Sequence, residues 1–142
     1  MNTRHSMEVR IYYEDTDCGG VVYYANYLKY FERARTHYLE THGLSVSELI
    51  QQGTEFRVTK AELAYRSAAM HGETLVVETT ATADRRIAIT FSHVIRERTS
   101  HRLVVEGSAT LVAVDSQGKI KRIPPPILKA LNLPTDSPTS ST

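Results

Sequence analysis

The chain has 142 residues, enough for one domain that buries roughly 68% of the surface its unfolded form exposes. A net charge of +1 leaves no broad basic footprint for nucleic acid, and 41% hydrophobic and 23% charged residues are typical of a globular domain. One cysteine excludes an internal disulfide, and no apolar run is long enough for an integral membrane segment, so we expect a soluble, cytoplasmic protein.

The first third of the chain predicts one strand and two helices. Residues 7–13 are rich in β-branched and aromatic types, which favour a strand, and the Asp- and Gly-rich residues 14–20 interrupt it. From about 24 to 41 apolar residues recur at helical spacing and predict a long helix. A shorter helix is expected over 45–52, because Ser45 and Glu48 form a capping-box pair.

The rest of the chain predicts strands over about 55–66, 74–83, 87–95 and 102–114, then a short helical turn at 127–131. Because the connections are short, we expect these four strands to be antiparallel neighbours in a meander. The fold class is therefore α+β, with an antiparallel sheet of about five strands wrapped around the long central helix. We expect one domain over 1–131 and a disordered Pro-, Ser- and Thr-rich tail over 132–142.

Tyrosines gather around the predicted strand-to-helix loop. Six of the eight lie within nineteen residues: Tyr12, Tyr13, Tyr23, Tyr24, Tyr27 and Tyr30. One interpretation is ordinary core filling by good strand and helix-flank residues. The other is a pocket walled by amphipathic rings, which would suit an acyl or aryl group with one polar end.

Asp15 and Asp17 precede the long helix in the same loop, where turn chemistry and helix capping explain Asp15 adequately. For Asp17 the Gly19–Gly20 pair favours a site, since residues without Cβ allow a ligand to approach closely. The helix N-terminus that follows offers free N–H groups and a partial positive charge. A carboxylate facing such donors suits hydrolysis of an ester or thioester, although this pattern alone is weak.

A longer pattern is more specific. The run Tyr-Glu-Asp-Thr-Asp-Cys-Gly-Gly-Val-Val-Tyr-Tyr-Ala-Asn-Tyr at 13–27, followed by Phe-Glu-Arg-Ala-Arg at 31–35, resembles the signature of the 4-hydroxybenzoyl-CoA thioesterase family. Within that family the chain is most similar to the Tol-Pal-associated, YbgC-type acyl-CoA thioesterases. The resemblance covers residues 7 to about 125 and implies a hotdog fold.

The resemblance also implies a function. Members are acyl-CoA thioesterases without a metal or organic cofactor, and they form homodimers, often paired into homotetramers, with the CoA ester bound at the dimer interface. A functional link to the Tol-Pal envelope system follows from the resemblance only. The catalytic carboxylate falls on Asp17, and it acts either as a nucleophile or as a general base, which the sequence leaves open.

Other site residues carry over by position. The backbone amide that polarises the thioester carbonyl falls on Tyr24, and Tyr13 matches a tyrosine that lines the site. Gly19, Gly20 and Tyr27 complete the predicted substrate pocket. Close relatives often have histidine in place of Tyr24, and a phenol cannot carry protons near neutral pH as imidazole does. The backbone amide is unaffected by that difference.

Two alternatives remain. A hotdog dehydratase or isomerase pairs an acidic residue with a histidine on the central helix, and residues 24–36 contain no histidine. A non-catalytic acyl-CoA-binding module, or an accessory protein of an envelope complex, would not need Asp17. Cys18 could be a nucleophile, but no neighbouring cation in the sequence would activate its thiol. The six histidines show no metal-ligand spacing.

Overall fold

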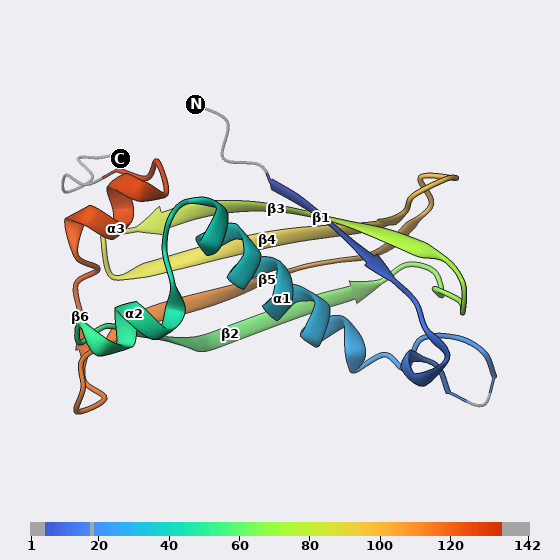
Figure 1. Ribbon diagram of the computed structural model, residues 1–142, viewed down its shortest axis with the longest axis horizontal. Helices are drawn as coiled ribbons and strands as arrows, with labels where there is room; N and C mark the ends of the chain where they lie inside the picture. The colour runs from blue at the N-terminus through green and yellow to red at the C-terminus, as the bar shows by residue number, and fades with distance from the viewer. Residues whose placement is uncertain (1–4, 18, 135–142) are drawn as a thin grey trace.

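The computed structural model describes residues 5–17 and 19–134, which form one antiparallel sheet with a long helix lying across it (Figure 1). In chain order the elements are β1 (His5–Arg10), the 3-10 helix η1 (Tyr13–Asp15), α1 (Asn26–Thr41), α2 (Val46–Gln51), β2 (Glu55–Tyr65), β3 (Thr74–Asp84), β4 (Ala88–Glu97), β5 (Leu103–Val114), β6 (Ile120–Lys121) and α3 (Pro125–Ala130). This is the predicted α+β arrangement. In the described part of the chain, no helix is both long and apolar enough to cross a membrane.

The order of strands in the sheet differs from the prediction. It is β1-β3-β4-β5-β2, with β6 paired to the end of β5. Only β3, β4 and β5 form a meander, because β2 pairs with β5 and lies at the opposite edge from β1. The predicted four-strand meander was therefore wrong. Residues 66–73 cross the end of the sheet instead of turning, and the N–H groups of Arg66 and Ser67 both reach the Val104 carbonyl of β5, at 2.8 and 3.1 Å.

Two apolar clusters fill the space between α1 and the sheet. The α3-end cluster contains Tyr38, Leu39, Leu49, Ala81, Ile89, Phe91, Ala109, Leu111, Ala113, Ile123, Ile127, Leu128, Leu131 and Leu133. The loop-end cluster contains Val9, Ile11, Val22, Tyr27, Tyr30, Phe31, Ala34, Ala69, Leu75, Val77, Ile95, Val104 and Val105. Strand alternation explains both, since mostly alternate residues of β3 and β4 are buried.

A glycine of β5 lets α1 and β2 approach closely. A Cβ on Gly107 would collide with the backbone carbonyl oxygen of Glu62 on β2 and would lie 3.0 Å from the Phe31 ring of α1. Only a residue without a side chain fits at this position of β5.

Some element boundaries differ from the sequence-based prediction. β1 ends at Arg10 rather than at residue 13, because residues 12–15 form a turn. In that turn the Asp15 carboxylate accepts the N–H of Tyr12 at 2.9 Å, and the Asp15 N–H donates to the Tyr12 carbonyl at 3.0 Å. The prediction that Ser45 caps α2 is confirmed, as its side chain accepts the Glu48 N–H at 3.4 Å.

Ordered packing also extends past the predicted end of the domain. Leu133 is buried in the α3-end cluster, and its N–H donates to the Leu128 carbonyl at 2.8 Å. The rest of the predicted tail, residues 135–142, lies outside the described residues.

Candidate active site

A tight hairpin presents Asp17 at the end of the molecule where α1 begins (Figure 1). Thr16 and Val22 form an isolated antiparallel bridge, and the Asp17 N–H donates to the Val21 carbonyl at 2.9 Å. Gly20 closes the turn with φ +82, donating its N–H to the Asp17 carbonyl at 3.0 Å. This left-handed conformation is one that glycine adopts without strain.

The Asp17 side chain is exposed and uses one of its two oxygens in the turn. Its Oδ1 accepts the Gly19 N–H at 2.8 Å. The other oxygen has no partner among the described residues and remains available to a ligand or a water. A Cβ on Gly19 would lie 3.3 Å from Oδ1, so the first glycine leaves room for the carboxylate itself. Cys18 lies outside the described residues.

Beside the hairpin, two backbone donors lie free at the start of α1. The Tyr23 N–H and the Asn26 side chain both bond to the Asp15 carbonyl, at 3.1 and 2.9 Å, and the Asn26 N–H donates to the Tyr23 carbonyl. The N–H groups of Tyr24 and Ala25 have no acceptor within the described residues. These free donors give this end of the helix its positive character.

Tyr24 itself is not part of α1. The helix begins at Asn26, two residues later than the prediction, with Ala25 as N-cap, so Tyr24 lies in the preceding turn. Because the hairpin folds residues 16–22 back on themselves, it returns the chain from Asp17 directly to this turn. The predicted carboxylate and the predicted N–H donor therefore belong to one small loop.

The six tyrosines divide between the two interpretations. Tyr27 and Tyr30 are core residues of the loop-end cluster, whereas Tyr12, Tyr13, Tyr23 and Tyr24 are exposed. Burial raises the pKa of the Tyr27 phenol, so this hydroxyl stays protonated, and it accepts the Ala69 N–H at 3.4 Å. The exposed rings form the aromatic surface around the hairpin.

Two further aromatic residues join this surface from distant parts of the sequence. Tyr65, at the end of β2, packs edge-on to Tyr24 with ring centroids 6.0 Å apart. His71 packs edge-on to Tyr13 at the same distance, and both line an open cup with Tyr12. Sequence reasoning missed Tyr65 and His71, because nothing local indicates that residues 65–71 return to this loop.

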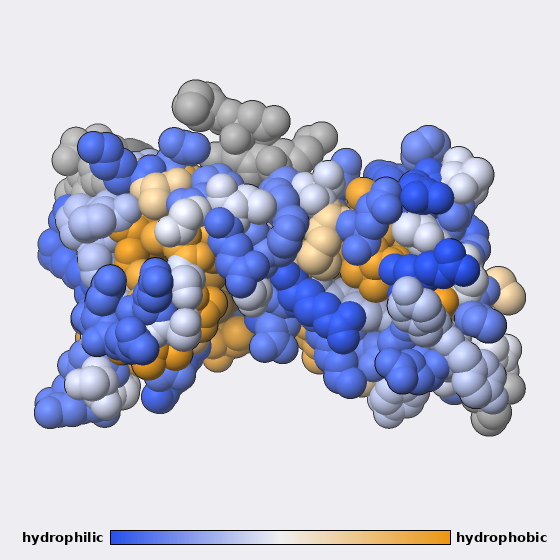
Figure 2. Space-filling model, viewed as in Figure 1, coloured by the Kyte–Doolittle hydropathy of each residue, from blue (hydrophilic) through white to orange (hydrophobic). Residues whose placement is uncertain are grey.

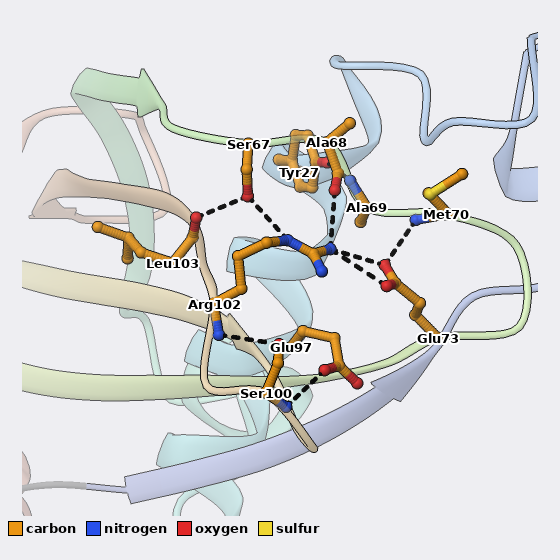
Figure 3. Close-up of polar contacts among 10 residues, drawn as sticks. All are labelled: Tyr27, Ser67, Ala68, Ala69, Met70, Glu73, Glu97, Ser100, Arg102 and Leu103. Carbon is orange, nitrogen blue, oxygen red and sulfur yellow. Dashed lines mark hydrogen bonds and ion pairs between the residues drawn. The ribbon is translucent and has the colours of Figure 1, made fainter.

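Residues 66–73, called the floor segment below, contact the Asp17 hairpin through their backbone. Figure 3 shows part of this segment, from Ser67 to Glu73. The Val22 N–H donates to the Ala69 carbonyl at 2.8 Å, and Val21 forms a bridge with Met70. This segment was predicted only as a break between strands. It instead supports the hairpin that carries Asp17.

A separate apolar cavity of about 170 Å³ lies between α1, α2 and the sheet. Leu39, Leu49, Phe56 and Phe91 are among its lining residues, and none of the residues 11–27 belongs to it. Figure 2 shows apolar surface at this end of the molecule, near α2 and α3. This apolar cavity and the Asp17 loop are thus at different places in the described part of the chain. In the described ranges no group of three or more His, Cys, Asp or Glu side chains could hold a metal ion.

A long helix packed in the curve of an antiparallel sheet, with its N-terminus beside a loop carboxylate, defines a hotdog domain. The profile of the thioesterase-like superfamily matches residues 11–131. The acyl-CoA thioesterase YbgC of Haemophilus influenzae is 39% identical over 119 residues, which cover 83% of this chain and 85% of that protein. The acyl-CoA thioester hydrolase YbgC of Shigella flexneri is 37% identical over 107 residues, covering 75% and 79%. The chain therefore belongs to the thioesterase-like superfamily.

Solved structures show the same fold at lower sequence identity. A 1,4-dihydroxy-2-naphthoyl-CoA thioesterase from Synechocystis superposes with a TM-score of 0.86 at 23% identity, covering 91% of this chain and 96% of that one. The 4-hydroxybenzoyl-CoA thioesterase of Pseudomonas sp. strain CBS-3 superposes with a TM-score of 0.81 at 20% identity, covering 89% and 98%. The predicted hotdog fold is confirmed.

Proposed function

We propose that this protein is an acyl-CoA thioesterase that hydrolyses an acyl-CoA to a free acid and CoA, with Asp17 as its catalytic carboxylate. In this proposal the backbone N–H of Tyr24 polarises the thioester carbonyl. The supporting observation is that one loop carries both a carboxylate oxygen and a backbone N–H that have no hydrogen-bond partner among the described residues. If the thioester carbonyl oxygen accepts a hydrogen bond from this N–H, the negative charge that develops on the oxygen during the reaction is stabilised by the same donor.

Asp17 can act by two routes, either as a nucleophile or as a general base. As a nucleophile, one carboxylate oxygen attacks the carbonyl carbon, the C–S bond breaks, and CoA leaves as a thiolate that takes up a proton. Water then hydrolyses the mixed anhydride and restores Asp17. As a general base, Asp17 removes a proton from water while the water oxygen attacks the carbonyl carbon, and that proton passes to the leaving thiolate.

The test is Asp17→Asn, with a matched control elsewhere in the chain. Asparagine keeps a side-chain oxygen that can accept the Gly19 N–H, so the turn survives while charge and basicity are lost. We expect kcat to fall by about 10²–10⁴-fold with little change in KM, measured as released thiol on a panel of acyl-CoAs.

Asp115 is the control, because its Oδ1 accepts the Gln117 N–H at 2.8 Å in the same kind of turn. Asp115→Asn should leave kcat unchanged.

The same assay separates the alternatives. Cys18→Ala should cost less than a few-fold in kcat. An inactive Cys18→Ala variant combined with an active Asp17→Asn variant would make this a thiol enzyme. Wild-type protein that binds acyl-CoA but releases no thiol would instead favour the non-catalytic binding module.

We also propose that the active form is a homodimer or homotetramer. β2 is an edge strand with largely exposed residues, and such an edge is a liability that pairing with a second copy removes. Tyr24 and Tyr65 are exposed beside this edge, which gives the second copy an aromatic surface to cover. Light scattering at micromolar concentration should give at least twice the chain mass of 16.0 kDa. An active monomer would contradict the proposal.

A cytoplasmic location and a functional link to the Tol-Pal envelope system are further proposals, supported by the likeness to YbgC alone. Co-purification of Tol-Pal components with the tagged protein from its own cells, lost when the gene product is replaced by an unrelated hotdog protein, would support the link. Fractionation of the same cells tests the location.

A further inference from the structure

The floor of the site is itself held in place by a polar network. Residues 66–73 support the Asp17 hairpin through two backbone bonds, from the Val22 N–H to the Ala69 carbonyl at 2.8 Å and from the His71 N–H to the Gly20 carbonyl at 3.3 Å. A short irregular segment lacks the repeating backbone hydrogen bonds of a helix or a sheet, so other contacts must fix its position. Any displacement of the floor would therefore move the hairpin with it.

One arginine joins three points of this segment. Arg102, immediately before β5, donates from Nη2 to the Ala68 carbonyl at 2.9 Å and to both carboxylate oxygens of Glu73, at 2.9 and 3.2 Å. Its Nε donates to the Ser67 hydroxyl at 3.2 Å. Figure 3 shows the guanidinium enclosed between Ser67, Ala68 and Glu73. The planar fork of arginine makes this simultaneous contact possible.

The partners of Arg102 are bound in turn. Glu73 Oε1 also accepts the Met70 N–H at 2.9 Å, which closes the turn that leads into β3. The Ser67 hydroxyl donates to the Leu103 carbonyl at 2.7 Å. The floor segment is thus fastened at its beginning, middle and end to one side chain anchored at the start of β5.

This ion pair differs from the others on the described surface. The Arg102 and Glu73 side chains are 37% and 23% exposed, whereas those of Arg98 and Glu8 are 55% and 57% exposed. A more enclosed pair is less screened by solvent, and leaving one partner unpaired is more costly. The hydrogen-bond geometry and the burial of this pair together indicate that Arg102 and Glu73 hold residues 66–73 in place.

We propose that Arg102 and Glu73, aided by Ser67, are positioning residues that hold the Asp17 hairpin in the orientation that acyl-CoA hydrolysis requires. This inference rests on the proposed function of Asp17. Among the described residues the network is joined to the hairpin through the floor segment, and in this way it would orient the carboxylate relative to the bound thioester. A displacement of about 1 Å in a reacting group can cost about a hundredfold in rate.

The test compares two variants with two matched controls. Arg102→Lys keeps the positive charge but not the fork, and Glu73→Gln keeps the shape but not the charge. We expect each to lower kcat by at least about tenfold with KM changed by less than about twofold, because orientation is lost while substrate binding is not. Arg98→Lys and Glu8→Gln alter the exposed pair in the same ways and should leave kcat unchanged.

A second readout does not depend on activity. Amide hydrogen exchange at Val22, measured by NMR, should accelerate in Arg102→Lys and Glu73→Gln but not in the controls, since the bond to Ala69 loosens. Variants with a lower Tm but normal kcat would show that the network is merely structural and would overturn the proposal. Unchanged exchange at Val22 would overturn it as well.

The experiment also separates this inference from the proposed function. If wild-type protein hydrolyses acyl-CoA and Asp17→Asn abolishes the reaction while the Arg102 and Glu73 variants keep full kcat, only the positioning role fails. If wild-type protein releases no thiol from any acyl-CoA, the proposed function fails and this role in hydrolysis fails with it.

Discussion

The two apolar clusters under α1 share a helix and a sheet but end differently. The α3-end cluster is closed by apolar side chains of α2, α3 and the chain up to Leu133. The loop-end cluster passes instead into a surface of exposed tyrosines, a hairpin held by backbone bonds and an enclosed ion pair. The α3 end of the hotdog domain is thus covered by apolar side chains, which stabilise the fold. The loop end is covered by polar and aromatic groups that are exposed to solvent.

Truncating one buried side chain in each cluster should separate these roles. Leu128 and Ile11 are both fully buried, and Leu128→Ala or Ile11→Ala should cost about 2–5 kcal/mol of unfolding free energy. The Ile11 N–H donates to the Glu73 carbonyl at 2.9 Å, and this backbone bond remains in Ile11→Ala. The cavity left beside it should nevertheless let residues 66–73 shift, so only Ile11→Ala should lower kcat well below the melting temperature. Urea unfolding and thiol release measure the two effects. If Leu128→Ala and Ile11→Ala lost kcat equally, the proposed difference between the two clusters would be wrong.

A buried histidine between α1 and the sheet should make stability depend on pH. His93 stacks on Phe31 and bonds to Thr79, and burial, aided by the charge of Arg35, lowers its pKa to about 3. The folded state therefore keeps His93 neutral while the unfolded state protonates near pH 6.5, so stability falls as pH drops from about 6.5 toward 3. The slope from this group approaches about 1.4 kcal/mol per pH unit.

The His93→Gln variant isolates this contribution. Between pH 6.5 and 5 the free energy of unfolding should decline less steeply in the variant than in wild type. The pKa of Glu97 is lowered by hydrogen bonds from Ser100 and Thr99, so its stabilising contribution is lost only at more acidic pH. Parallel slopes in wild type and variant would contradict the assignment.

Two buried tyrosines, one in each apolar cluster, allow a further comparison in which the expected changes in unfolding free energy are smaller. The Tyr38 hydroxyl in the α3-end cluster has no partner among the described residues, whereas the Tyr27 hydroxyl accepts the Ala69 N–H. Tyr38→Phe should therefore raise the unfolding free energy by about 1 kcal/mol, and Tyr27→Phe should lower it by a similar amount. Denaturant midpoints at constant m-value provide the measurement. A shift of the same sign in both variants would refute this.

The C-terminal residues should have the smallest effect. Deleting residues 135–142 leaves Leu133 and its contacts in place, so melting temperature and kcat should not change. A fall of several degrees in the melting temperature would show that the tail packs against the domain or a neighbouring subunit.

The sequence by itself determined the local structure and the identity of the loop. Helical spacing over about 24–41 predicted α1, the strand pattern of residues 74–83 predicted β3, and Ser45 predicted the cap of α2. The run at 13–27 indicated the family. These features depend on residues close in sequence, whose periodicity and turn chemistry are visible without knowing what they pack against.

Only the tertiary structure decided which strand pairs with β5 and what supports the site. Alternation is the same whichever neighbour a strand has, so the choice of β5 for β2 depends on how residues 66–73 cross the sheet. Tyr65, His71 and the Arg102–Glu73 pair approach the Asp17 hairpin from distant positions in the chain. Contacts between segments this far apart in sequence are fixed by packing and by hydrogen-bond partners that exist only in the folded chain.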